Sequence, residues 1–120
     1  MQQLIETIFA AGPSAKPYYL ARTGWLDDAE PEKVEHIYRE YSGKYRAALS
    51  ELEELMDKPQ RSLESDREWI RSWFPEAIEA AVWQRNDRYI CLAVEHHDRE
   101  TPVGLVLRCL TAEELQELSK

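Results

Sequence analysis

The stretch from Pro31 to Met56 constrains the fold most, because its apolar residues recur at steps of three and four. This spacing is the repeat of a helix with one buried face. Pro31 suits the first helical position, and Lys58 is the expected boundary because it precedes Pro59 and is therefore disfavoured in helical geometry. We therefore predict one long amphipathic helix over 31–56, with acidic side chains on its opposite face.

Shorter helices are predicted around it. Residues 2–11 carry apolar side chains at helical spacing. Ser65 to Glu68 and Thr111 to Glu114 each match a capping box, which opens a helix. Pro75 breaks the helix after the first box, and we expect one or two further helical turns over 75–81.

The last third of the chain changes to β-type patterns. Runs 88–95 and 103–110 are rich in Val, Leu and Ile and flank a polar stretch, which predicts an antiparallel hairpin. Residues 82–85 would add a short strand and make a three-stranded meander. Segment 13–30 is irregular, and its large apolar residues indicate a short strand or an extended segment over the core.

These elements predict an α+β fold in a single domain over 1–120. A helical N-terminal two thirds, with one long amphipathic helix, would pack on a small antiparallel β-hairpin or three-stranded meander. A short C-terminal helix would follow.

The formal charge is −8, and its excess lies in the helical half. Residues 27–40 hold six acidic and two basic side chains, residues 51–68 hold seven and three, and residues 80–110 are balanced. Binding of nucleic acid needs clustered Lys and Arg, so this class of partner is not expected. A basic protein partner is favoured, because complementary charge speeds encounter. The alternative is that the charge only keeps the chain soluble.

The sequence gives no indication of a membrane partner, because it contains no run of 18 apolar residues. The N-terminus lacks the basic region of a signal peptide, so we expect a cytoplasmic protein with reduced thiols. A hairpin symmetric about residue 100 would place Cys91 opposite Cys109. A disulfide between them is the alternative to two free, buried thiols, which we expect.

The candidate partner surface combines acidic residues with tyrosines that share one face of the predicted helix. The tyrosines either pack the core or contact a partner, where Tyr and Trp are enriched. Trp25 and Trp83 are candidates to extend this surface. The predicted partner-binding residues are Asp27, Asp28, Glu32, Glu35, Tyr38, Glu40, Tyr41 and Tyr45.

The leading hypothesis is a non-enzymatic, acidic protein-binding module for a basic protein partner. By analogy alone, such a chain suits an inhibitor of a basic toxin or nuclease, of the immunity-protein type. We expect no cofactor and no metal, because the sequence has no phosphate-binding glycine loop, no C-x-x-C and no zinc motif.

Two alternatives remain. A small enzyme or ligand-binding domain would use the stretch Glu95-His96-His97-Asp98, with His36 as the only other histidine. Alternation along an extended segment would aim His96 and His97 in opposite directions, which weakens a two-histidine site. The second alternative is a structural subunit that forms a homodimer through the tyrosine face of the long helix.

Overall fold

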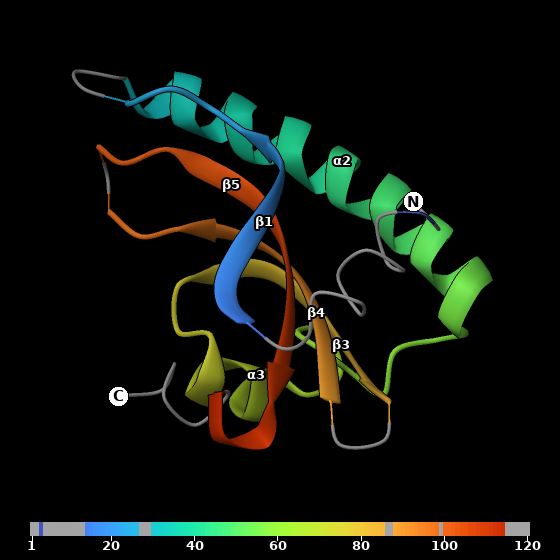
Figure 1. Ribbon diagram of the computed structural model, residues 1–120. Coiled ribbons are helices and arrows are strands. Elements are labelled where there is room, and N and C mark those ends of the chain that lie inside the picture. The colour runs from blue at the N-terminus through green and yellow to red at the C-terminus, as the bar shows by residue number, and fades with distance from the viewer. Residues whose placement is uncertain (1–2, 4–13, 27–29, 86–87, 99, 115–120) are drawn as a thin grey trace.

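A long helix lies across one face of a five-stranded antiparallel sheet in the computed structural model (Figure 1). The structure describes residues 3, 14–26, 30–85, 88–98 and 100–114. The sheet order is β1-β5-β4-β3-β2. In chain order the elements are β1 (Ser14–Arg22), α2 (Pro31–Met56), β2 (Arg61–Ser62), α3 (Arg67–Trp73), β3 (Ala77–Arg85), β4 (Arg88–His96) and β5 (Val103–Thr111).

The predicted architecture is wrong in its proportions. Strands dominate the fold, and the helical N-terminal two thirds packed on a hairpin or three-stranded meander does not occur. The meander itself is present as β3, β4 and β5, but β1 and β2 extend it on both sides. The predicted helix over 2–11 lies outside the described residues, except for position 3.

The segment after Pro75 is the first reason for the error. Its alanines favour a helix, but Ala77–Arg85 forms β3 and pairs with β4 from Ala77↔Glu95 to Arg85↔Arg88. Helix propensity is a weak prior that tertiary pairing overrides. Small alanines also allow close packing on both faces of β3. Ala81 belongs to the hydrophobic cluster beneath α2, and Ala80 belongs to the cluster beneath α3.

The irregular segment before the long helix is the second reason. Ser14–Arg22 forms β1, an edge strand that pairs with β5 and shifts register twice. Pro17 is tolerated there because an edge strand has one side without ladder partners. Because of its prolines and its interrupted alternation of apolar and polar residues, this segment does not predict a regular strand of nine residues.

The long helix occurs at the predicted bounds, Pro31–Met56. Its apolar stripe packs on the face of the sheet that carries Trp83, Leu92 and Leu107. The helix ends where Asp57 adopts a positive φ of 63° and its carbonyl accepts a hydrogen bond of 2.9 Å from the buried Trp83 indole.

The opposite face of the sheet is covered by α3 and its flanking residues. Ile70, Phe74 and Leu63 pack against a second cluster on this face, which includes Cys91 and Val106. Helix α3 has only seven residues. Beyond the end of α3 this face of the sheet is not covered by a helix of the described residues, and the candidate site lies there.

The two predicted capping boxes have different outcomes. Thr111 and Glu114 exchange hydrogen bonds of 3.2 Å between side chains and backbone amides, as predicted. Helical residues follow from 112 to 114, and the rest of the predicted terminal helix lies outside the described residues. At Ser65 the prediction is wrong, because α3 begins at Arg67 after Asp66, and no side-chain cap bond forms.

The two cysteines are free and buried. Cys91 pairs with Arg108, and Cys109 pairs with Ile90, so the register differs by one residue from the symmetric hairpin. The cysteines consequently belong to the clusters on opposite faces of the sheet. Burial raises the pKa of the Cys91 thiol, and burial likewise raises the pKa of Cys109. Both thiols are therefore held in their unreactive, protonated form.

No helix among the described residues is both long and apolar enough to span a membrane.

The packing of α2 gives a direct stability test. Leu52 is fully buried, whereas Leu55 on the same helix is 39 % exposed. We expect Leu52→Ala to lower the free energy of unfolding by about 2–5 kcal/mol, because it leaves a cavity in the core. Leu55→Ala is the matched control and should change it by no more than about 0.5 kcal/mol. Urea unfolding followed by circular dichroism measures both, and similar losses would contradict this packing.

Candidate functional site

The candidate site lies on the α3 face of the sheet, beyond the end of α3. Strand alternation places Glu95 and His97 on this face with Cys91 and Ala93, while His96 faces α2. Arg108 on β5 lies on the same face as Glu95, and the two side chains meet. Where α3 no longer covers the sheet, this face carries charged side chains in place of apolar ones.

Glu95 and Arg108 form a buried, bidentate ion pair. The Arg108 Nη1 donates to Oε2 at 2.6 Å, and Nη2 donates to Oε1 at 2.9 Å. Only 6 % of Glu95 and 7 % of Arg108 is exposed. Such fork-to-fork bonds combine charge with fixed geometry. The Arg108 Nε is buried and has no hydrogen-bond partner within the described part of the chain.

His97 connects the ion pair to a second carboxylate. Its Nδ1 contacts Glu76, which follows α3, and its Nε2 lies 3.6 Å from Oε1 of Glu95. The imidazole is about half exposed. Glu76, His97, Glu95 and Arg108 thus form a continuous charged and polar row from the surface into the sheet.

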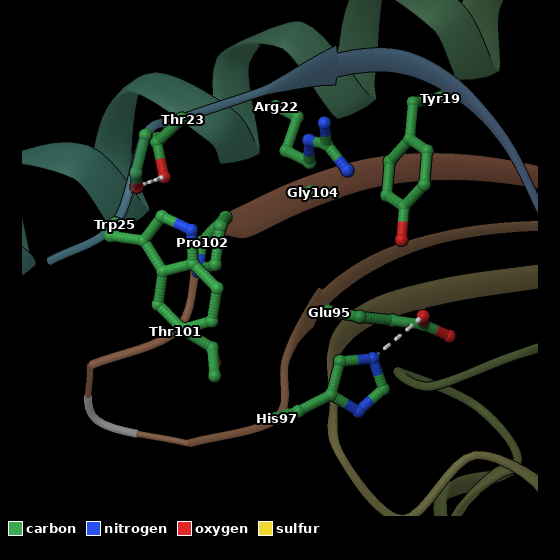
Figure 2. A pocket seen from close by; sticks show the side chains of 10 residues that line it. Tyr19, Arg22, Thr23, Trp25, Glu95, His97, Thr101, Pro102 and Gly104 are labelled. Carbon is green, nitrogen blue, oxygen red and sulfur yellow. Dashed lines mark hydrogen bonds and ion pairs between the residues drawn. The ribbon is translucent and has the colours of Figure 1, made fainter.

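A hollow of about 270 Å³ opens beside this row, and we call it the sheet-face hollow (Figure 2). Glu95 and His97 also line a second hollow of about 210 Å³ toward α3. Figure 2 shows Tyr19 on one side of the sheet-face hollow and Trp25 beside Pro102 on the other, with Glu95 and His97 below them. The lining residues are Tyr19, Arg22, Thr23, Gly24, Trp25, Glu95, His97, Thr101, Pro102 and Gly104.

Gly104 sets the position of the Tyr19 wall. A Cβ at residue 104 would lie 2.9 Å from Cε1 of Tyr19, closer than real Cβ contacts. The absent side chain therefore lets the Tyr19 ring lie against β5. The Arg22 guanidinium carbon lies 4.8 Å from the centre of the same ring, a cation–π distance.

The Trp25 wall is fixed through its backbone. Thr23 N donates to the Val103 carbonyl at 2.9 Å, and Val103 N donates to Thr23 Oγ1 at 2.9 Å. Leu26 N donates to the Glu100 carbonyl at 2.8 Å, and the Leu26 side chain is buried. The segment 23–26 is thereby fastened to the start of β5 and to the β4–β5 connection, while the Trp25 side chain remains 69 % exposed.

The ion pair limits the chemistry of the site. Glu95 and Arg108 neutralise each other's charge, so neither stands as a free base or electrophile. Within the described ranges, no group of three or more His, Cys, Asp or Glu side chains is arranged to hold a metal ion. What the hollow offers a ligand is two aromatic walls and the remaining acceptor capacity of a buried carboxylate.

The structure separates the residues of the predicted partner surface. Tyr41 and Tyr45 are buried in the core against the sheet. Burial is the main reason that the pKa of each is raised, so both hydroxyls stay protonated. Glu32, Glu35 and Glu40 are exposed on α2. Asp27 and Asp28 lie outside the described residues.

Tyr38 has a structural contact rather than a free hydroxyl. It is half-buried, and its hydroxyl lies 2.5 Å from Nδ1 of His96. The His96 Nε2 lies 3.0 Å from the Thr101 carbonyl, which can only accept, so Nε2 donates there and Nδ1 accepts from Tyr38. Burial raises the pKa of Tyr38, which keeps the hydroxyl a donor. This bond fastens α2 to the end of β4.

The four residues of the Glu95–Asp98 stretch divide as alternation predicts. Glu95 and His97 face the sheet-face hollow, whereas His96 bonds to α2 on the other face. Asp98 is exposed in the turn that follows, where its backbone bonds to Thr101. His36 is exposed on α2, across the sheet from His97.

Of the two tryptophans considered for the surface, Trp25 is exposed and Trp83 is fully buried. Sequence reasoning missed the pairing of Glu95 with Arg108. A signal was available, because Arg108 is a lone charge inside an apolar run, and a buried charge requires a partner.

Comparisons of this chain with protein-family models, with curated proteins and with solved structures find no match.

Removing one member of the ion pair should be costly. Arg108→Met leaves the buried Glu95 carboxylate without its bidentate partner, so we expect a loss of about 3–5 kcal/mol in the free energy of unfolding. The double variant Glu95→Leu/Arg108→Met replaces both charges and should recover most of that loss. Urea unfolding of both variants and the wild type measures the difference. A single variant as stable as the wild type would contradict a coupled, buried pair.

Proposed function

We propose that the chain is a non-enzymatic binding module that holds a basic protein partner. The observation that carries the proposal is Trp25, a large aromatic side chain that is 69 % exposed and lines a hollow together with the buried Glu95. Exposed aromatic residues of this kind are enriched at the energetic centres of interfaces. By analogy, an inhibitor of a basic toxin or nuclease is the form of this function that we expect.

Charge around Trp25 supports a basic partner. The first turns of α2 follow the Trp25 segment along the chain, and Figure 1 places them at the same end of the molecule as the β4–β5 connection. Exposed Glu32 and Glu35 come from α2, and exposed Asp98 and Glu100 come from the connection. The whole chain carries a formal charge of −8, which favours the approach of a positively charged surface.

The helix contributes charge to this proposal rather than an aromatic stripe. Tyr41 and Tyr45 are buried in the core, so they are not available for contact with a partner or with a second copy of the chain. Glu32, Glu35 and Glu40 keep their carboxylates in solvent. Cytoplasmic placement is part of the proposal, and the two buried, free thiols support it.

A pair of charge reversals tests the role of this end. Glu32→Lys/Glu35→Lys and Glu51→Lys/Glu54→Lys change the net charge equally, and all four residues are exposed on α2. The first pair lies near the Trp25 segment, and the second lies at the far end of the helix. Wild type and both variants are used to capture proteins from the native cell, with quantification by mass spectrometry.

We expect a basic protein to be captured by the wild type and by the Glu51/Glu54 variant, and to be depleted about tenfold or more with the Glu32/Glu35 variant. Its capture should also weaken as salt increases. Equal depletion by both variants would mean that only net charge matters. Capture of a partner that none of these changes affects would overturn the proposal.

A further inference from the structure

The sheet-face hollow has the composition of a receptor for a positively charged side chain. Its two walls are aromatic, with Tyr19 43 % exposed and Trp25 69 % exposed. Figure 2 shows the Tyr19 hydroxyl directed toward the side where Glu95 lies. Aromatic faces attract cations through the ring quadrupole, and the attraction grows where water is excluded.

The carboxylate of Glu95 can accept more than it receives from the protein. Each oxygen accepts one bond from Arg108, and His97 Nε2 lies at 3.6 Å from one of them. An ionised carboxylate offers about four lone-pair sites. Acceptor capacity therefore remains on a group that is itself nine-tenths buried and lines the hollow.

Hydrogen-bonding capacity at the hollow favours a cation over an anion. Glu95 lines the hollow and has lone pairs to spare, whereas Glu76 lines the second hollow. Both terminal nitrogens of Arg108 are committed to Glu95, and its Nε is buried, so the side chain presents no open fork to an anion. Arg22 opposes a cation, but it is exposed at the rim over Tyr19, where its charge is screened.

We propose that the sheet-face hollow receives an arginine side chain of the basic partner. Its planar guanidinium stacks on Trp25, and its N–H groups donate to Glu95, while the aliphatic stem lies against the Tyr19 wall. Arginine is preferred to lysine because its flat, weakly hydrated group both stacks and donates in a fixed fork. This inference rests on the proposed function and names the group that the module recognises.

A small probe separates this inference from binding of the whole partner. N-acetyl-L-arginine methylamide is titrated into the full chain, and the indole N–H of Trp25 is followed by NMR. Trp25→Phe assigns the signal. The matched probe is the citrulline analogue, which keeps the shape and loses the charge. Inorganic phosphate tests the opposite reading, an anion site.

We expect the arginine probe to shift the Trp25 indole signal saturably, with a dissociation constant on the order of 1 mM. The citrulline probe should bind about tenfold more weakly, because it lacks the charge-assisted bond to Glu95. Tyr19→Leu should weaken the arginine probe while the dispersed spectrum of the folded chain is retained. Arg22→Gln should strengthen it about twofold, because a competing charge is removed.

Equal shifts from arginine and citrulline would overturn the inference. Phosphate shifts that disappear in Arg22→Gln would replace it with an anion site. Loss of partner capture by Glu32→Lys/Glu35→Lys, with no response of Trp25 to arginine, would refute the inference and leave the proposed function standing. If arginine binds at Trp25 but no basic protein is captured, the arginine site would stand and the proposed basic protein partner would be refuted.

Discussion

The register of the β4–β5 pair is the constraint on which the rest of the structure depends. In this register Glu95 lies opposite Gly104, and Cys91 lies opposite Arg108. Glu95, Gly104 and Arg108 therefore share the face that carries the hollow, while His96 is delivered to Tyr38 on α2. A slip of one residue between the two strands would turn one strand over relative to the other, so that Glu95 and Arg108 would lie on opposite faces of the sheet. Core and site are thus set by one alignment.

Stability alone does not explain why an ion pair is buried here, because a well-packed apolar pair would often make the fold as stable as the ion pair does. Around Glu95 and Arg108 the apolar cover of α3 has ended, and two hollows meet. A charge held rigidly by a bidentate partner presents its remaining lone pairs in a fixed direction, and little is lost in ordering it when a ligand arrives. In the proposed function, Glu95 would form the floor of the binding site and Arg108 would hold its carboxylate in place.

Sequence reasoning succeeded where one local pattern determined the element. The long helix obeyed its 3.6-residue repeat from Pro31 to Met56, and alternation correctly separated His96 from His97. Sequence reasoning failed where long-range pairing determined the structure. The alanines of Ala77–Ala81 favour a helix, but this segment pairs with β4 in the sheet. The site could not be assembled in advance, because Tyr19, Trp25 and Glu95 meet only through the β1–β5–β4 order.

The helix and the hollow would play different parts in the proposed function. Exposed carboxylates such as Glu32 and Glu35 act over about a Debye length and chiefly raise the rate of encounter with a basic surface. They confer little specificity, since each remains solvated. In this proposal Trp25 and Glu95 would act only at contact, where desolvation strengthens stacking and hydrogen bonding and slows dissociation. Selectivity would then reside in the sheet face, although most of the excess charge lies in the helical half of the sequence.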